Sequence, residues 1–360
     1  MRVAVVGAGA FGGWTALHLL RAGCDVTLID AWGAANSRSS SGDETRVIRG
    51  AYGPNAMYTR MVARSVPMWR DLEAAAGQTL LHSVGSLWMA PEGGDEWERA
   101  SLENIRAAGM SVEVLRRDGL ERLHPGVNWS GIAWALFEPD LGYLMARRAC
   151  QAVVRMFERE GGRYLIQTEV PPADAAVCAC GPWLGAMIPD VLGALITATR
   201  QEVFYFGDAP GRAPFPAWVD NTAPRHYGIA GNEGRGFKAA RDVPGPEWDP
   251  TAGDRTPSAE PLADARAYVA FRFPRLADAP LLESRVCQYE MSADGHLILD
   301  RHPGGGPVWF AGGGSGHSFK IAPAVGEHMM ELVLGKRQPD PAFALARFGS
   351  GPVERRWERK

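Results

Sequence analysis

Four residues near the N-terminus have the types and the spacing that bind a dinucleotide. Gly7, Gly9 and Gly12 form a GxGxxG motif, and Asp30 follows about 20 residues later. Gly7 permits a tight turn, Gly9 lets backbone N–H groups approach a pyrophosphate, and Gly12 allows a helix to pack closely. Asp30 is placed to accept hydrogen bonds from a ribose. The motif predicts dinucleotide binding without saying which dinucleotide.

The elements that must hold these residues follow one another in the right order. An apolar strand is predicted at residues 3–6, a helix after the glycines and a second apolar strand at residues 26–30. A helix that begins at the glycine turn offers its partial positive charge to the phosphates. An ordinary βαβ unit is the alternative, but strand, helix and acid together favour a Rossmann-like dinucleotide-binding unit.

Two further segments suit contact with a bound cofactor. Residues 34–49 form a polar loop in which serines precede Arg46 and Arg49. The loop is either a flexible linker or a segment that crosses a cofactor and brings cations into a pocket. Residues 312–317 form a glycine-rich turn before the last predicted helix, which favours a second anion site. His317 ends this turn, as either a hydrogen-bonding pocket group or a structural histidine.

The composition is that of a globular protein. The 360 residues are 46% hydrophobic and 22% charged, with a net charge of -3 that does not suggest a nucleic-acid partner. No apolar run reaches the length of a membrane-spanning helix. The five cysteines lack metal-site spacing and fit a reducing compartment. We therefore expect a cytoplasmic protein with no bound metal and no membrane partner.

The predicted elements indicate an α/β fold of two domains, each built from separated parts of the chain. Strands and helices alternate at both ends and in the middle, whereas the chain from Gln201 is richer in strands. A helix is expected at residues 56–76, with Pro67 as a kink or a later start. We expect a Rossmann-like domain from residues 1–83, 142–199 and 291–360, and a substrate domain with a mixed β-sheet from residues 84–141 and 200–290.

The chain resembles the FAD-dependent amine oxidases of the monomeric sarcosine oxidase and N-methyl amino acid oxidase group, within the D-amino acid oxidase-like class. The resemblance covers most of the chain in order. Beyond the N-terminal unit, it rests on residues 43–52, 137–142, 236–238, 285–289, 294–303 and 314–320. It implies that the dinucleotide is FAD, bound by the Rossmann-like domain, with Asp30 at the ribose of its adenosine half.

The resemblance implies roles for residues around the substrate. Lys238 would reach the flavin N5 edge through a water, where a fixed cation helps dioxygen accept electrons; a solvent-facing lysine is the alternative. Arg49 and Lys320 would hold the substrate carboxylate and lower the pKa of the substrate amine, with a surface ion pair as the alternative. Tyr227 and Tyr289 resemble aromatic pocket residues, with core aromatics as the alternative.

The resemblance also implies a covalent flavin. Cys287 would be joined to the flavin 8α-methyl group, and a plain buried cysteine is the alternative. Arg285 lies on the same face of the predicted strand and could favour the thiolate. Arg46 resembles an arginine beside the flavin, and the second glycine turn would face the negative charge of the reduced ring. The expected cofactor contacts are Gly7, Gly9, Gly12, Asp30, Ser40, Arg46, Cys287, Gly314, Gly316 and Lys320.

Three features depart from the family pattern. Gly42 stands where the family often has a histidine near the flavin. Pro171 and Pro172 join two strands almost directly, where extra β structure usually covers the adenine side. Residues 229–234 match no single substrate. These departures leave the substrate less defined than the fold.

We expect oxidation of a secondary amino acid, N-methyl or cyclic, with hydrolysis of the imine product and reduction of dioxygen to hydrogen peroxide. The partners would be a small amino acid and dioxygen, and the protein a monomer or weak oligomer. The alternatives are a flavin dehydrogenase that passes electrons to a quinone or carrier, an NAD-dependent dehydrogenase, and a flavoprotein that binds ligand without turnover. Lys238 favours the oxidase over the flavin dehydrogenase.

Overall fold

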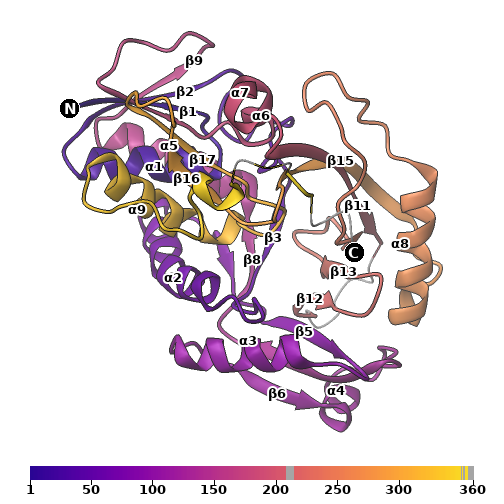
Figure 1. The fold of residues 1–360 in the computed structure, drawn as a ribbon. Helices are drawn as coiled ribbons and strands as arrows, with labels where there is room; N and C mark the ends of the chain where they lie inside the picture. The colour runs from indigo at the N-terminus through magenta and orange to yellow at the C-terminus, as the bar shows by residue number, and fades with distance from the viewer. Residues whose placement is uncertain (208–214, 350, 352, 356–360) are drawn as a thin grey trace.

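The N-terminal unit lies at the centre of a six-stranded sheet. The computed structural model describes residues 1–207, 215–349, 351 and 353–355 (Figure 1). Neighbouring strands of this sheet are parallel except for the antiparallel pair β16 and β17 at one edge. Their order is β16 (Ile298–Arg301), β17 (Val308–Gly312), β10 (Ala175–Cys178), β1 (Arg2–Val6), β2 (Asp25–Asp30) and β9 (Arg163–Ile166).

Helices from both ends of the chain pack together on this sheet. Figure 1 shows α1 (Ala10–Arg21), α5 (Ala146–Arg159) and α9 (Ala322–Val333) gathered on one face, with α2 (Ala56–Ala76) beside them. The helices α1 and α9 approach closely at Gly326, where a Cβ would lie 2.6 Å from the Trp14 backbone. The helix α2 begins at Ala56 and contains Pro67, so the expectation of a later start is wrong.

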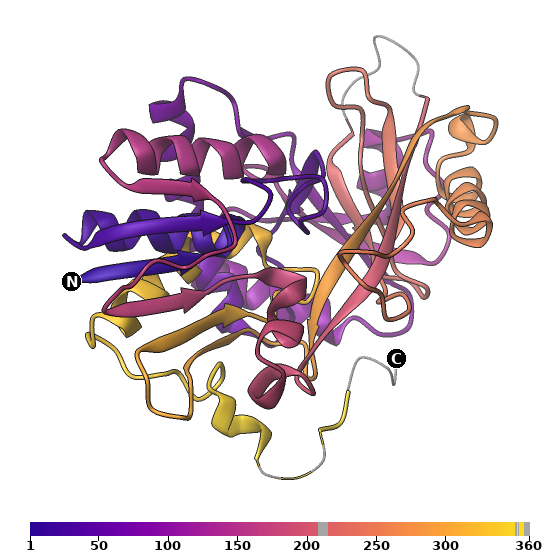
Figure 2. The same cartoon turned by 90° about the horizontal axis from the view of Figure 1, so that it is seen from above.

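The second large sheet has eight strands and is mixed. Its pairs are antiparallel except for the parallel pair β12 and β5. Figure 2 shows β11 and β15 as long strands that extend from beside the six-stranded sheet towards α8 (Ala259–Arg272). The order is β15 (Leu281–Ser292), β11 (Ile196–Phe206), β14 (Phe237–Arg241), β13 (His226–Ile229), β12 (Ala217–Asp220), β5 (Ser86–Pro91), β7 (Ile132–Glu138) and β6 (Glu113–Arg116).

Smaller elements complete the fold. A three-stranded sheet of β3 (Thr45–Ile48), β8 (Gly142–Met145) and β4 (Leu81–His82) contains the strand that follows the serine-rich loop. The helices α3 (Glu96–Ala107) and α4 (Arg117–Leu123) lie by β5 and β6 in Figure 1. Short helices α6 (Leu184–Met187) and α7 (Pro189–Leu192) follow β10, and single 3-10 turns occur at Gly181–Trp183, Pro274–Leu276, Phe319–Ile321 and Leu345–Phe348.

The two large sheets confirm the expected α/β class, with a Rossmann-like part and a mixed-sheet part, each discontinuous in sequence. The exact domain limits stay a prediction, and those at 199/200 and 290/291 fall within β11 and β15. None of the helices that the structure describes combines the length and the apolar composition needed to cross a membrane.

Candidate functional site

The glycine turn has the geometry that its sequence predicts. Gly7 has a φ of +103°, and a Cβ there would lie 2.3 Å from the Ala179 carbonyl oxygen. A Cβ on Gly12 would lie 1.7 Å from the Gly7 carbonyl oxygen, so any side chain would push α1 away from the turn. Gly9 precedes α1 and supplies no side-chain cap, which leaves the first amides of the helix available to an anion.

Asp30 lies at the end of β2, against the glycine turn. Its Oδ2 accepts the Ala8 N–H at 2.8 Å, and its Oδ1 accepts the Trp32 N–H at 2.9 Å. Each carboxylate oxygen can accept a further hydrogen bond. Asp30 is therefore held in place by the backbone and still has capacity for the hydroxyl groups of a sugar.

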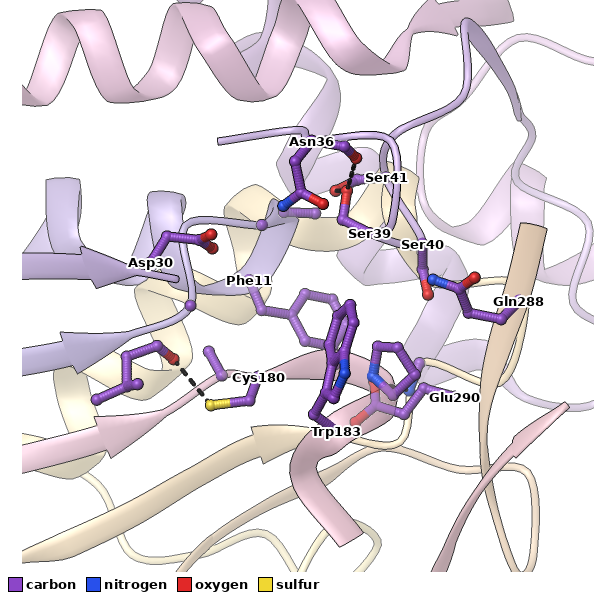
Figure 3. A pocket seen from close by; sticks show the side chains of 18 of the residues that line it. Phe11, Asp30, Asn36, Ser39, Ser40, Ser41, Cys180, Trp183, Gln288 and Glu290 are labelled. Carbon is purple, nitrogen blue, oxygen red and sulfur yellow. Dashed lines mark hydrogen bonds between the residues drawn. The ribbon is translucent and has the colours of Figure 1, made fainter. Parts of the chain in front are cut away.

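A large cavity of about 330 Å³ opens in front of this turn. Figure 3 shows Phe11, Trp183 and the serine-rich loop pointing into it. Two buried oxygens on its wall, Ser40 Oγ and Glu290 Oε1, have no partner among the described residues. Burial raises the pKa of Glu290 to about 7. The predicted contacts on the wall are Gly7, Gly9, Asp30, Ser40, Arg46, Gly314 and Gly316.

These features fit FAD. A phosphate would meet the free amides of α1, a ribose would meet Asp30, and hydroxyl groups would satisfy Ser40 and Glu290. The second glycine turn reaches the same wall, but its Gly314 N–H faces Glu290 Oε2 at 3.4 Å. The contacts of the individual residues with FAD stay a prediction.

Aromatic residues cover the end of the large cavity that holds Asp30. Trp32 and Trp183 have ring centroids 5.1 Å apart, and Gln167 and Met187 join them on the wall. These side chains supply cover at the end where the double-proline connection lacks extra strands. A Cβ on Gly42 would lie 2.2 Å from the Asn36 carbonyl oxygen, so the folded loop itself fills the place of a side chain at Gly42.

A second, small cavity of about 70 Å³ adjoins the large one. Arg46, Tyr289, Gly316 and Phe319 line both cavities. The small cavity brings together most of the predicted substrate residues with two carboxylates. These residues are Arg49, Tyr227, Tyr289, His317 and Lys320, the carboxylates are Asp43 and Asp242, and the predicted flavin-attachment residue Cys287 lines the same cavity.

Arg49 and Lys320 are buried cations without a salt bridge among the described residues. The Arg49 guanidinium lies against the Trp88 ring and donates to the Ala51 carbonyl. Lys320 Nζ donates to the Tyr52 hydroxyl at 3.0 Å and to the His317 carbonyl at 2.5 Å. Burial, with the charge of Arg49, lowers the pKa of Lys320 well below its ordinary value. The carboxylates Asp242 and Glu138 raise the pKa of both cations but form no salt bridge with them within the described chain. Two buried cations without a direct ion pair favour an added anion.

Lys238 is buried, so its interpretation as a solvent-facing lysine is wrong. Its side chain is 1% exposed and contacts Asp43 Oδ2 at 2.5 Å. Asp43 also binds Arg46 at 2.6 Å and accepts a hydrogen bond from the Tyr205 hydroxyl at 3.0 Å. Lys238 is not among the described residues that line either cavity, whereas Asp43 lines the small one.

Cys287 lies between the loop and the small cavity. Its Sγ is 3.6 Å from Arg46 Nη2 and 3.8 Å from the Ser40 carbonyl oxygen. The cation in contact with this sulfur is therefore Arg46. Arg285 was expected to favour the thiolate, but it pairs with Glu283. A shared strand face was too little information, because the strand β3 brings its own cation, Arg46, to Cys287 on β15.

The remaining predicted pocket residues are held by neighbouring groups. The Tyr289 hydroxyl donates to Asp242 Oδ1 at 3.3 Å, and burial raises the pKa of Tyr227 and Tyr289. A Cβ on Gly316 would lie 2.7 Å from the Tyr289 ring. The His317 ring contacts the Gly295 carbonyl oxygen at 3.0 Å, and burial lowers its pKa to about 3. His317 is therefore neutral at physiological pH.

Sequence reasoning missed three acidic residues of this site. Asp43 opens a segment that carries the resemblance, and its position beside an arginine pair was the available signal. Asp242 lies in the small cavity, four residues after Lys238. Glu290 follows Tyr289 on β15 and has no signal in the sequence pattern.

Comparison with known proteins finds one matching family and relatives with related names. The family described as FAD dependent oxidoreductase matches residues 2–332. The chain is 27% identical to monomeric sarcosine oxidase of Bacillus sp. (strain B-0618), over 94% of this chain and 93% of the relative. It is 28% identical to peroxisomal sarcosine oxidase of Mus musculus, over 96% and 94%. It is 26% identical to N-methyl-L-tryptophan oxidase of Yersinia pestis (strain Pestoides F), over 96% and 98%.

Solved structures share the fold. L-proline dehydrogenase from P. horikoshii superposes with a TM-score of 0.85 at 21% identity, covering 98% of this chain and 99% of that one. A modified fructosyl peptide oxidase from Aspergillus nidulans superposes with a TM-score of 0.82 at 21% identity, covering 98% and 95%. These matches support the arrangement of the two large sheets.

Proposed function

Because the chain belongs to the FAD-dependent oxidoreductase family, we propose that it oxidises the C–N bond of a secondary amino acid, either N-methylated or cyclic. Sarcosine oxidase and N-methyl-L-tryptophan oxidase among its relatives support this substrate class. FAD held in the large cavity would supply the redox chemistry: the substrate gives up a hydride from the carbon beside the amine and a proton from the nitrogen, and dioxygen takes up these two electrons and two protons as hydrogen peroxide. Water would then hydrolyse the imine product to a carbonyl compound and an amine.

One observation carries this proposal: a carboxylate and two buried cations, which form no salt bridge with the described residues, line the same small cavity. Arg49 and Lys320 would hold the substrate carboxylate, the arginine by a two-pronged contact and the lysine by its charge. Asp242 would accept an N–H of the substrate amine, since each carboxylate oxygen can accept more than the contact it has from Tyr289 at 3.3 Å or Arg225 at 3.6 Å. A small amino acid would place its carboxylate at the two cations and its amine at Asp242.

The neighbouring residues would orient the substrate and the cofactor. Tyr227 and Tyr289 would enclose the substrate carbon, and the neutral His317 would hold the turn that carries Gly316. We propose that Cys287 attaches FAD covalently, supported by its place beside Arg46 and the wall of the small cavity. Lys238 would supply positive charge near the reacting edge when dioxygen is reduced.

The cysteines bear on the compartment in which the protein works. All five cysteines are free, which favours a reducing compartment such as the cytoplasm. We propose a monomer or weak oligomer with a small amino acid and dioxygen as its partners.

Aerobic assays of the purified yellow protein would test this function. The protein is mixed with N-methyl and cyclic amino acids, and hydrogen peroxide is measured together with the carbonyl product. We expect equal amounts of both from at least one substrate. Substrate oxidation that yields peroxide only after an artificial acceptor is added would contradict the oxidase and favour a dehydrogenase. No oxidation of any substrate would favour a flavoprotein that binds without turnover.

A further inference from the structure

The Asp43 carboxylate lies between two cations, the buried Lys238 and the partly exposed Arg46. Its Oδ2 contacts Lys238 Nζ at 2.5 Å and Arg46 Nη1 at 2.6 Å, while its Oδ1 accepts the Tyr205 hydroxyl. The side chains of Asp43 and Lys238 are 3% and 1% exposed. The other hydrogen bond of Lys238 Nζ goes to the neutral Thr45 carbonyl at 3.1 Å. Asp43 is therefore the carboxylate in contact with Lys238 within the described chain.

The charges named around Lys238 are equal in number, three arginines against three carboxylates. From the loop and β3 it faces Asp43 and Arg46, from β11 the neutral Tyr205, and from β15 the Cys287 sulfur. Further out, two arginines and two glutamates pair with one another at the rim, and these are Arg235, Arg285, Glu44 and Glu283. An ammonium group buried in this setting is stable only while a close carboxylate compensates its desolvation.

We propose that Asp43 is a positioning residue that keeps Lys238 protonated and fixed behind the wall of the small cavity. The inference rests on the proposed function, in which Lys238 supplies charge when dioxygen is reduced. Asp43 makes that charge permanent across the working pH range. Its oxygens are engaged by Arg46, Lys238 and Tyr205, so the carboxylate acts through Lys238.

The direction of each electrostatic effect supports this role. Burial lowers the pKa of Lys238, Asp43 raises it and Arg46 lowers it, and with Asp43 in place the pKa still lies below its ordinary value. Replacing Asp43 by asparagine removes the effect that raises the pKa and leaves the two that lower it. Lys238 is charged below its pKa and neutral above it, so the variant loses this cation at a lower pH than the wild type does.

A simpler role for Asp43 would be to neutralise Lys238. In that case, Asp43→Asn would leave the positive charge of Lys238 unneutralised at every pH. The reaction with dioxygen would then be faster by the same factor across the pH range. The two roles differ in pH dependence, because only loss of a proton from Lys238 gives the variant a titration that the wild type lacks.

The test measures how fast substrate-reduced protein is reoxidised by dioxygen in a stopped-flow instrument, between roughly pH 6 and pH 10. We expect a flat profile for the wild type up to about pH 9. Lys238→Met should be slower by roughly 100-fold, the effect of removing one preorganised charged group, and also flat. Asp43→Asn should fall with rising pH towards the Lys238→Met rate. The double variant should be flat, because no lysine is left to titrate.

A second readout does not depend on turnover. The midpoint potential of bound FAD, followed by spectroelectrochemistry against pH, should show an extra inflection in Asp43→Asn. The inflection should be absent from the wild type and from the double variant. Tyr205→Phe is the matched control, since it removes one hydrogen bond to Asp43 without removing a charge, and its profile should stay flat.

The outcomes separate this inference from the proposed function. If Lys238→Met is as fast as the wild type, the proposed role of Lys238 fails. If Lys238→Met is slow but Asp43→Asn stays flat or is uniformly faster, the inference about Asp43 fails. Should Asp43→Asn not fold, Asp43→Ser takes its place. The wild-type profile is also a test. If its reoxidation rate declines below about pH 9, and Lys238→Met abolishes that decline, the inference is overturned.

Discussion

Arg49 and Lys320 lie against the same aromatic ring, although they come from opposite ends of the chain. The Arg49 guanidinium carbon is 4.8 Å, and the Lys320 ammonium 5.0 Å, from the centre of the Tyr52 ring. The faces of aromatic rings attract cations, so Tyr52 partly offsets the cost of burying both charges. The ring cannot replace a counter-ion, and the small cavity beside the two cations is therefore suited to an anion.

Replacing Arg49 should weaken binding of carboxylates. Arg49→Met removes charged hydrogen bonds of about 1.5–3 kcal/mol, so the dissociation constant of an inert carboxylate ligand should rise roughly 10-fold to 100-fold. The measurement is a spectral titration of bound flavin. Arg241→Met is the control, because Arg241 is exposed at the end of β14. Unchanged affinity in Arg49→Met would contradict the anion site.

Asp242 should recognise the amine end of the same ligand. Asp242→Asn keeps the shape of the side chain but removes its charge, so an amine-bearing carboxylate should bind more weakly. A carboxylic acid of similar size without nitrogen should bind with nearly unchanged affinity. Titrating both ligands against wild type and variant measures the difference. Equal losses for the two ligands would show that the substitution disturbs the pocket through Tyr289.

Cys287→Ser should release the flavin. If the thiol carries FAD, acid precipitation of the wild type leaves a yellow pellet, whereas the serine variant leaves the colour in the supernatant. Cys150→Ser is the control, because Cys150 is also buried but lies on α5. Free flavin in the wild-type supernatant would contradict covalent attachment.

His317 should make the protein less stable in acid. Its pKa in the folded protein is about 3, against an ordinary value of 6.5, so the unfolded chain binds a proton that the folded chain does not. The stability that depends on neutral His317 is complete above pH 6.5 and is lost as the pH falls towards 3. At pH 5 the loss is about 2 kcal/mol. Urea unfolding at pH 7 and pH 5 measures it, and His317→Asn should show a smaller decrease than the wild type. An equal decrease in both would contradict the shift.

The sequence predicted the parts of this molecule that depend on local pattern. The turn at Gly7 and Gly12 could be predicted, because each glycine is required by backbone contacts within one βαβ unit. That Arg49 and Lys320 lie close together could be inferred only through the resemblance, because no local sequence pattern links two segments so far apart in the chain. Their common place in the small cavity agrees with that inference.

The remaining features depend on contacts between distant elements. Strand alternation put Arg285 on the face of Cys287, but β3 places Arg46 at the sulfur. The ion pair of Asp43 and Lys238 joins the loop before β3 to β14, and no periodicity encodes it. Glu290 is defined by its unpartnered oxygen at the wall of the large cavity, which only a folded structure reveals.

The most direct test of the account is anaerobic mixing of the yellow protein with N-methyl and cyclic amino acids, followed by absorbance. We predict that at least one of these amino acids bleaches the flavin in the wild type, and that Arg49→Met requires a much higher concentration of it. Failure of every secondary amino acid to reduce the flavin, while the protein still binds FAD, would contradict the proposed function.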